Sequence, residues 1–584
     1  MYSEKPESMD EAALVYGELW EGAYDEDVLR TFEGTRATIK ETMLGHLEGE
    51  NADRPLIYFE DVVITRRQAD SAACRLGNGL LGLGVNRGDR VGIVASNRPE
   101  TVLSFMACYK SGFVAAAYNQ RCTSCEIERA LANVGATALI IEEDTLAKLM
   151  SVLQGDALPA LKVVVVLEAS DCCCRADSWS EGIPPVSSRS EVCLPKEIPA
   201  RLVQSDFTSL LRKSSVTEPC VNVTGEDAAI ILFTGGTTGI SKACCQTHGR
   251  MVLELEAMHH WVRSSLESGP ANILVCMPMT HIMGINYGVH WQLVNGGSVV
   301  IASGNKPQDI KMAFERYRPS VWATLPTLLH SIASDEDIAQ TPYANLDLVI
   351  FGGSFISKNL LDDLIAKTRA RFVESYGMSE SFGFVTCNPV RSMGKVGSIG
   401  IPLSNTDVLV VDAQQGIRPL APGERGEIVF RGPQIIQEYW NNSAETKIAL
   451  RNGWLYSGDI GYMDQEGFFY LVDRKKDTIV VSGFNVFPNE IDETLLTYPD
   501  VMDACTVGVP DEHSGERPKS FIVMKNGTQL DKSNLIAHCR ERLVAYKVPK
   551  YFEVVEEIPK TKARKPDRAF LRRIELQKKE LETV

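Results

Sequence analysis

Short runs typical of buried strands alternate with helical segments over most of the first 380 residues, and this alternation constrains the fold most. Residues 90–96 (RVGIVAS) and 138–142 (ALIIE) are compact β-rich runs, and residues 126–133 between them have helical spacing. The alternation resumes after residue 228, with strand-like runs at 229–233, 272–275, 298–302 and 346–351. Such alternation favours a layered α/β domain with parallel strands.

The rest of the chain predicts smaller units. Closely spaced strand and turn signals in residues 396–472 are typical of a small β-rich subdomain, and the charged run 473–477 (DRKKD) suits a linker. Residues 169–217, richer in Ser, Pro and Cys, are expected to be a surface excursion. We therefore predict an α/β protein with two domains. Residues 1–473 form a large N-terminal domain of layered α/β subdomains plus the β-rich subdomain, and residues 474–584 form a small mobile α/β C-terminal domain.

The acidic balance of the chain excludes some functions. Its 584 residues carry 60 Lys and Arg against 76 Asp and Glu, a net charge of −16. Sequence-independent nucleic-acid binding depends on neutralising phosphates, so we expect no nucleic-acid partner. No apolar run approaches the roughly 18 residues of a membrane helix, so we expect no integral membrane contact. The acidic N-terminus fits no signal or transit peptide, and the 15 cysteines are interpreted as reduced thiols, which together predict a cytoplasmic protein.

Residues 231–242 (ILFTGGTTGISK) are the most informative segment. An apolar strand leads directly into a Gly/Thr turn and then Lys242. Glycines let backbone N–H groups approach an anion closely, and the hydroxyls and the lysine add donors and charge. The segment is not a Walker A loop, because Ser241 rather than Gly precedes the lysine and no Ser or Thr follows. It predicts a phosphate-binding loop, with a mobile turn as the alternative.

This segment resembles the phosphate-binding signature of the adenylate-forming superfamily, which includes acyl-CoA synthetases, luciferases and peptide-synthetase adenylation domains. It departs from that signature at Ser241 and Ala243, where Pro and Gly are usual. The resemblance implies that Thr237 contributes to catalysis and to Mg²⁺ binding. The implied phosphate-binding residues are Thr234, Gly235, Gly236, Thr237, Thr238, Gly239 and Lys242.

Further segments resemble family motifs in the family's order. In residues 278–284 (PMTHIMG), His281 would lie beside the acyl pocket, with a packing histidine as the alternative. Residues 375–380 (SYGMSE) resemble the signature in which Tyr376 stacks near adenine and Glu380 holds Mg²⁺, with a solvated carboxylate as the alternative. The other nucleotide contacts implied here are Gly352, Gly353, Ser354, Ser375, Gly377 and Ser379.

Motifs nearer the C-terminus extend the resemblance. In residues 453–459 (GWLYSGD), Asp459 would accept hydrogen bonds from both ribose hydroxyls. Arg474 would be a second ribose or phosphate contact, and Lys476 the hinge position. Gly483 would belong to a loop that meets the pantetheine channel of CoA.

The last motif, residues 559–568 (PKTKARKPDR), is the least faithful, since Arg564 and Pro566 replace a glycine and an aliphatic residue. The resemblance implies that Lys565 is the adenylation lysine. Lys560 and Lys562 are rivals for that role, and a basic solvated tail is the alternative.

The implied activity is that of an acid–CoA ligase. A carboxylate attacks the α-phosphorus of ATP to give acyl-AMP and pyrophosphate, and the thiol of CoA then attacks acyl-AMP. Both reactants of the first step are anions, so an acidic protein must supply positive charge locally. The implied cofactors are ATP, Mg²⁺ and CoA, and the implied catalytic residues are Lys565, Glu380, His281 and Thr237.

The identity of the acid is less constrained. Residues 282–287 (IMGINY) lack the Asp with which amino-acid-activating relatives pair the substrate amine, and they suggest an apolar or aromatic tail. We expect a small-to-medium aliphatic, alicyclic or aromatic acid, in a setting such as fatty acid metabolism. The alternatives are a luciferase-like or stand-alone adenylating enzyme with another acceptor, and a non-catalytic acyl or nucleotide binder. Homodimer formation is left open.

Overall fold

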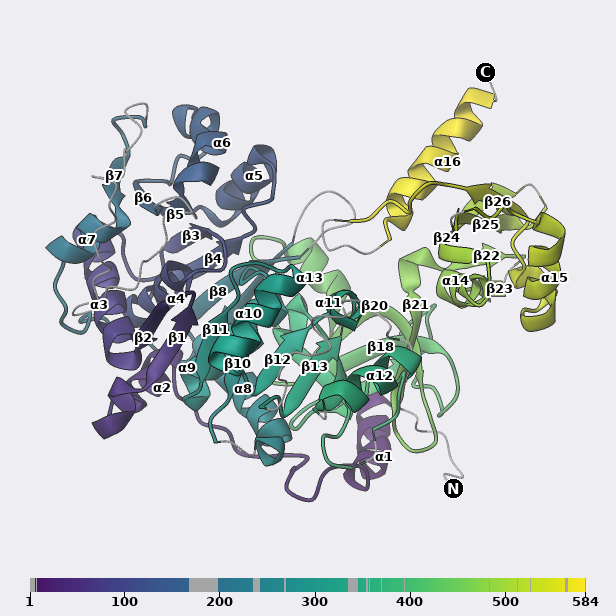
Figure 1. The fold of residues 1–584 in the computed structure, drawn as a ribbon, viewed down its shortest axis with the longest axis horizontal. Helices are drawn as coiled ribbons and strands as arrows, with labels where there is room; N and C mark the ends of the chain where they lie inside the picture. Colours follow the sequence, from purple (N-terminus) through teal and green to yellow (C-terminus); the bar gives the residue numbers. More distant parts are fainter. Residues whose placement is uncertain are drawn as a thin grey trace.

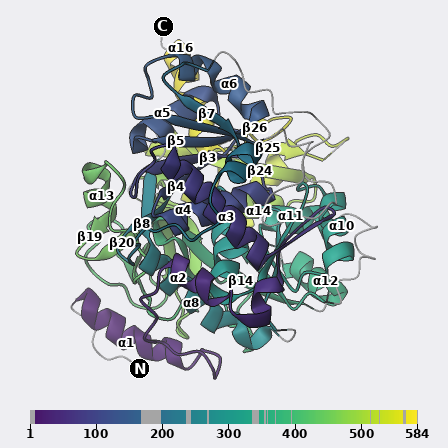
Figure 2. The ribbon, with the colours of Figure 1, turned by 90° about the vertical axis from the view of Figure 1, so that its left-hand side faces the viewer.

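The computed structural model describes residues 6, 8–167, 198–234, 242–266, 269–333, 345–352, 356, 358–368, 370–392, 394–482, 484–511, 513–525, 527–561 and 566–582. Within these residues the strands form four sheets, three in the larger part of the chain and one near the C-terminus. Figure 1 shows the C-terminal strands and helices gathered in a lobe at one side. The helix of residues 9–21 lies at the bottom of the view in Figures 1 and 2, and the helix of residues 568–582 lies at the top.

The first sheet has the layered α/β form that the alternation predicts. Its seven described strands are, in spatial order, β7 (Val203–Asp206), β6 (Val163–Leu167), β5 (Ala138–Glu142), β3 (Arg90–Val94), β4 (Val114–Tyr118), β8 (Ala228–Phe233) and β9 (Ala243–Thr247). All neighbours are parallel except β8 and β9. Alternate residues of β5 enter different cores, Ile140 on one face and Ile141 on the other. Coverage of both faces explains why its inner strands, such as β4 and β6, are continuous apolar runs.

The second sheet also carries residues of the predicted site. Its nine described strands are, in spatial order, β16 (Ile401–Pro402), β15 (Gly383–Cys387), β14 (Arg371–Met378), β13 (Leu348–Gly352), β12 (Val321–Thr324), β10 (Asn272–Val275), β11 (Ser298–Ile301), β1 (Pro55–Phe59) and β2 (Val62–Thr65). The strands from β14 to β1 are parallel, and antiparallel pairs finish both edges.

The third sheet is the β-rich subdomain expected in residues 396–472. Its described strands are β17 (Asp407–Val411), β18 (Gly426–Arg431), β20 (Trp454–Met463), β19 (Leu450–Arg451) and β21 (Phe469–Arg474), all paired antiparallel. The N-terminal helix α1 (Met9–Glu21) packs against β17 and buries Trp20 beside Phe469.

The fourth sheet forms the C-terminal lobe. Its described strands are β23 (Phe484–Val486), β22 (Ile479–Val481), β25 (Gly515–Met524), β24 (Val501–Asp511) and β26 (Tyr551–Val554), and its helices are α14 (Pro488–Leu496), α15 (Lys532–Arg542) and α16 (Arg568–Glu582). The one-turn helix η7 (Lys475–Asp477) leads into this sheet from β21. The boundary predicted between residues 473 and 474 therefore falls at the last residue of β21, and it stays a prediction.

The remaining described helices pack on the first three sheets. They are α2 (Ile39–Gly45), α3 (Arg66–Gly82), α4 (Pro99–Ser111), α5 (Ser124–Val134), α6 (Glu143–Gln154), α7 (Phe207–Lys213), α8 (His248–Val262), α9 (Trp291–Asn295), α10 (Pro307–Tyr317), α11 (Pro326–Ala333), α12 (Lys358–Thr368) and α13 (Ser443–Ala449). Shorter turns are η1 (Gly49–Asp53), η3 (Arg263–Ser265) and η8 (Ala545–Lys547). No described helix combines the length and the apolar character needed to cross a bilayer.

One expectation about the first sheet is wrong for residues 203–213. Residues 169–217 were expected to be a surface excursion, but β7 extends the sheet beside β6, and α7 follows it. Phe207, Leu210 and Leu211 of α7 are buried, and Asp206 caps the helix by accepting from the Ser209 amide. The Ser-, Pro- and Cys-rich composition of the region as a whole concealed this short apolar helix. Residues 168–197 lie outside the described part.

Candidate functional site

The predicted phosphate loop begins and ends between two adjacent strands. Thr234 follows β8, and Lys242 precedes the antiparallel strand β9. The Thr234 amide donates to the Lys242 carbonyl (2.9 Å), and the Lys242 amide donates to the Thr234 hydroxyl (3.3 Å). The two ends of the loop are therefore held together. Gly235, Gly236, Thr237, Thr238 and Gly239 lie outside the described residues.

Tyr439 connects the loop lysine with the predicted magnesium ligand. The Tyr439 hydroxyl donates to Glu380 Oε1 (2.7 Å), and the Lys242 ammonium lies 4.9 Å from the centre of the Tyr439 ring. Lys242 also pairs with Glu445 of α13 (2.6 Å). Burial and the Glu380 carboxylate raise the pKa of Tyr439, so its hydroxyl keeps its proton and orients Glu380. Sequence reasoning missed Tyr439, because no local pattern distinguishes a tyrosine in this loop.

A second group joins Tyr376, Asp459 and Arg474. The Tyr376 hydroxyl donates to Asp459 Oδ2 (2.6 Å), and Arg474 Nε donates to Asp459 Oδ1 (2.7 Å). Asp459 and Arg474 are register partners on β20 and β21, whereas Tyr376 comes from β14 of another sheet. Asp459 is 4% exposed, and its carboxylate raises the pKa of Arg474. The three predicted nucleotide residues thus meet where the second and third sheets meet.

The two groups belong to one site. Glu380 lies in η6 (Ser379–Ser381), immediately after β14, so it is four residues from Tyr376 along the same segment. Asp459 contributes most to the raised pKa of Arg474, and Tyr376, Asp477 and then Glu380 raise this pKa less. The predicted metal ligand Glu380, the lysine of the predicted phosphate loop and the pair predicted to bind ribose therefore lie in one region of the described structure.

Glycine is required where β13 and β14 approach each other. Gly352 is the register partner of Ser375, and a Cβ at Gly352 would overlap the Ser375 main-chain oxygen. The Ser375 hydroxyl donates to the Phe351 carbonyl (3.1 Å). Gly377 is equally confined, since a Cβ there would overlap the Gly383 main-chain oxygen. The close packing explains these two glycines; Gly353 and Ser354 lie outside the described residues.

His281 is exposed at the start of a buried π-helix, η4 (Met283–His290). Its main-chain N–H donates to the Pro278 carbonyl (2.9 Å), and its Nδ1 accepts from the Met283 amide (3.3 Å). The next turn reaches the Glu380 segment, because Asn286 Nδ2 donates to the Phe382 carbonyl (2.6 Å). π-Helical turns are rare and are frequent at functional sites.

Glu254 of α8 lies beneath this contact and is fully enclosed. Its carboxyl accepts from the Tyr287 hydroxyl (2.6 Å) and from Asn286 Nδ2 (2.7 Å). Burial raises the pKa of Glu254 to about 8, although these two donors oppose the rise. No pattern in the sequence distinguishes this buried carboxyl from a surface glutamate of an amphipathic helix.

The titration of Glu254 predicts a pH dependence of folding. A carboxyl with a raised folded-state pKa stabilises the fold fully below its unfolded pKa, and the contribution is lost as pH rises towards 8. Between pH 5 and pH 8, the Glu254→Gln variant should lose less unfolding free energy than the wild type, by about 2–4 kcal/mol. Urea denaturation at several pH values measures the difference. Parallel pH profiles for the two proteins would show that Glu254 is ionised in the fold.

The predicted hinge segment, residues 474–477, makes contacts with both lobes. Arg474 pairs with Asp459, and Lys475 pairs with Glu427 of β18 (2.7 Å). The Lys476 carbonyl and the Asp477 carboxylate instead accept from Arg572 of α16. Gly483 and Lys565 lie outside the described residues, as does the rival Lys562. The ammonium of Lys560, the other rival, lies 3.9 Å from Asp503 Oδ2. Lys560 and Pro566 form an isolated β-bridge.

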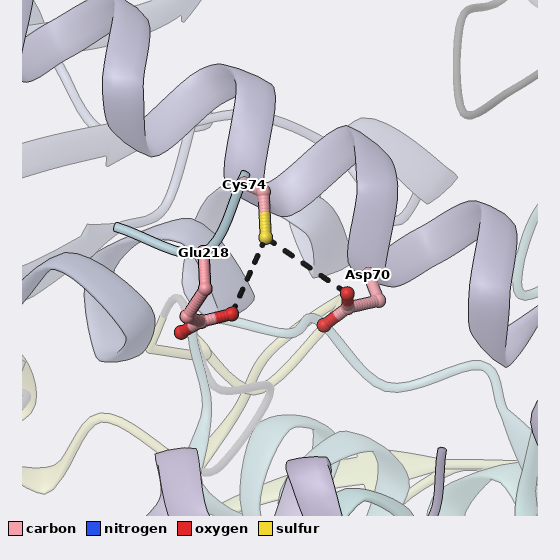
Figure 3. A group of neighbouring side chains, drawn as sticks. All are labelled: Asp70, Cys74 and Glu218. Atoms are coloured by element: carbon pink, nitrogen blue, oxygen red, sulfur yellow. Dashed lines mark hydrogen bonds between the residues drawn. The ribbon is translucent and has the colours of Figure 1, made fainter. Parts of the chain in front are cut away.

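A separate group of side chains resembles a metal site. Asp70, Cys74 and Glu218 converge as Figure 3 shows, with the sulfur 3.8 Å from Asp70 Oδ2 and 3.5 Å from Glu218 Oε2. The fully buried Lys110 ammonium, however, lies 2.6 Å from a carboxylate oxygen of each acid. Burial raises the pKa of the Cys74 thiol, so it keeps its proton. The group is therefore a charge cluster that joins α3, α4 and residue 218.

Comparison with known proteins agrees with this architecture. The model of the AMP-binding enzyme family matches residues 47–440, and that of the AMP-binding enzyme C-terminal domain matches residues 490–565. The chain is 27% identical over 545 residues to a long-chain-fatty-acid–CoA ligase of Bacillus subtilis, covering 93% of this chain and 95% of the relative.

Solved structures share the fold. An anthranilate CoA ligase in complex with anthranoyl-AMP has a TM-score of 0.79 at 23% identity, covering 94% of this chain and 98% of the other. The o-succinylbenzoate CoA synthetase of Bacillus subtilis, in complex with ATP and magnesium, has a TM-score of 0.73 at 24% identity, covering 90% and 98%. The protein is thus a two-lobed α/β enzyme of the adenylate-forming fold. It belongs to the AMP-binding enzyme family, whose members include AMP-forming acid–CoA ligases.

Proposed function

We propose that the chain is an ATP-dependent acyl-CoA synthetase that forms acyl-AMP and pyrophosphate and then the acyl-CoA thioester. The convergence of Tyr376, Asp459 and Arg474 from two sheets carries the proposal. A buried carboxylate held by a phenol and a guanidinium suits the two hydroxyls of a ribose, since both can donate to it. Membership of the AMP-binding family and the ligases among its relatives support the same activity.

In the first step, the chain's residues would hold two anions together. The Thr234–Lys242 loop binds the β- and γ-phosphates of ATP, and Lys565 bridges the substrate carboxylate and the α-phosphate. Glu380 and Thr237 supply hard oxygen ligands, as Mg²⁺ prefers, and Tyr439 orients Glu380. Bound Mg²⁺ would neutralise phosphate charge. Positioning and electrostatics then supply most of the catalysis, and no protein nucleophile is needed.

In the second step, the CoA thiol attacks acyl-AMP after the C-terminal lobe rotates about the hinge. Rotation removes Lys565 and brings the Gly483 loop towards the pantetheine channel. His281, exposed at the start of η4, borders the acyl group in this account.

The hinge assignment predicts a selective defect. Lys476→Pro fixes φ near −65° and stiffens the pivot, so thioester formation should fall about tenfold or more while adenylation changes little. Rapid-quench measurement of each half-reaction checks this. Lys476→Ala, which removes the same side chain without fixing φ, is the matched control. A Lys476→Pro enzyme with both half-reactions intact would exclude this residue as the pivot.

The substrate we propose is a small-to-medium carboxylic acid with an aliphatic, alicyclic or aromatic tail. Ile282, Met283, Ile285 and Tyr287 are all buried in or beside η4, which favours an apolar environment near His281. The names of two relatives specify an aliphatic and an aromatic acid, a long-chain fatty acid and anthranilate, and the first is longer than the acid proposed here. A role in fatty acid metabolism, a cytoplasmic location and homodimer formation stay predictions.

A panel of acids tests the proposed function. Pyrophosphate release is measured with fatty acids of increasing length, benzoates and cinnamates, with and without CoA, and AMP is quantified in parallel. The proposal predicts acid-dependent pyrophosphate release and CoA-dependent turnover to AMP. Acid-dependent release that CoA does not accelerate would instead favour a different acceptor. Absence of release with any acid would favour a nucleotide-binding protein without this activity.

A further inference from the structure

Arg572 joins the C-terminal helix to the hinge. Its Nη1 donates to the Lys476 carbonyl (3.0 Å), and its Nη2 donates to Asp477 Oδ1 (2.9 Å). Asp477 is 8% exposed, and the Arg572 side chain is 27% exposed, so the pair is largely shielded from solvent. One planar guanidinium thus holds a peptide oxygen and a carboxylate of η7 together, a geometry that a lysine cannot reproduce.

The helix that carries Arg572 is itself anchored. Arg568, at the first position of α16, donates to Asp492 Oδ2 (2.5 Å) and to the Thr506 carbonyl (3.1 Å). Leu571 is buried, and α16 packs along β24 before running out to the C-terminus (Figure 1). In the sequence, α16 begins three residues after Lys565.

The contacts of the hinge restrict where it can turn. Arg474 and Lys475 pair with Asp459 and Glu427 of the large lobe, whereas the next two residues are held by Arg572. A rotation that keeps both sets of contacts is confined to the linkage between residues 475 and 476. Asp473, which accepts from the Asn489 amide of the C-terminal lobe (2.8 Å), would have to exchange that contact.

We infer that Arg572 is a positioning residue that latches residues 476–477 to α16, so that the pivot and the C-terminal helix move as one body. α16 lies beyond residues 490–565, the range that the C-terminal family model matches. The effect of the latch on the half-reactions rests on the proposed function, whereas the latch itself does not.

Limited proteolysis tests the latch without any enzyme assay. Arg474, Lys475 and Lys476 are three successive sites for trypsin in one segment. Arg572→Ala should accelerate native-state cleavage there by about 5- to 10-fold, because the segment opens more often. Arg573→Ala, which removes an exposed guanidinium stacked over Phe570 on the same helix, should cleave at the wild-type rate. Equal rates in all three proteins, by mass spectrometry of the fragments, would overturn the latch.

The half-reactions test the positioning role. Arg572→Ala should lower the kcat of adenylation about tenfold with the KM for ATP within about twofold, and Arg572→Lys should recover little of it. Arg573→Ala should match the wild type. Unchanged adenylation in Arg572→Ala, despite faster cleavage, would overturn the positioning role. If the wild type adenylates no acid, the proposed function fails, and the trypsin result still decides the latch.

Discussion

Lys565→Ala is expected to slow acyl-AMP formation by about 1,000-fold while leaving thioester formation from supplied acyl-AMP within about threefold of wild type. The lysine is required only where two anions meet. Unit charges about 4 Å apart cost roughly 4 kcal/mol at an effective dielectric constant near 20, which corresponds to about three powers of ten in rate. Single-turnover assays of the two half-reactions measure the contrast.

The neighbouring lysines provide the controls for Lys565. Lys560 is 53% exposed and lies near Asp503, so Lys560→Ala should leave both half-reactions nearly unchanged. Lys562→Ala tests the remaining rival. A larger adenylation defect in Lys562→Ala than in Lys565→Ala would reassign the role. Equal losses in both half-reactions of Lys565→Ala would refute a function confined to adenylation.

Asp459→Asn is expected to weaken AMP binding by about 100-fold. The substitution keeps the shape of the side chain but removes the charge that faces Arg474 and the carboxylate oxygens that would accept from the ribose. Hydrogen bonds to a charged acceptor contribute about 1.5–3 kcal/mol each, so losing the equivalent of one or two accounts for the change. Isothermal titration calorimetry with AMP measures the dissociation constant.

Asp464→Asn is the matched control for Asp459→Asn. Asp464 directly follows β20, the strand of Asp459, and pairs with Lys395 (2.6 Å), which also involves a partly buried carboxylate and a cation. AMP affinity in Asp464→Asn should remain at the wild-type value, and thermal unfolding verifies that both variants fold. If Asp459→Asn bound AMP as tightly as wild type, the ribose assignment would be wrong.

The residue pattern within single segments correctly predicted several strands and helices. The β-rich run 138–142 is β5, and 272–275 is β10, with bounds that match the expectation, because strands covered on both faces are mostly apolar. The helix expected at 126–133 is α5, extended to Ser124–Val134 by a capping box between Thr123 and Glu126. Pro488 opens α14, where its missing N–H and fixed φ suit the first turn of a helix.

Contacts between distant segments could not be predicted in the same way. Tyr439 and Glu380 are 59 residues apart, and Arg572 and Asp477 are 95 apart, so no periodicity links them. β7 and α7 were missed because the Ser-, Pro- and Cys-rich composition of the whole region concealed a short apolar helix. Glu254 was missed because a buried carboxyl differs from an exposed one only in its partners.

A crystal structure of the chain with a non-hydrolysable acyl-adenylate analogue tests the proposed nucleotide site most directly. Both ribose hydroxyls of the analogue should lie within hydrogen-bond distance of the Asp459 carboxylate. Arg474 should lie alongside, and the phosphate should face the Thr234–Lys242 loop. An analogue bound away from Asp459, or one whose ribose contacts neither Asp459 nor Arg474, would contradict the nucleotide site and the mechanism built on it.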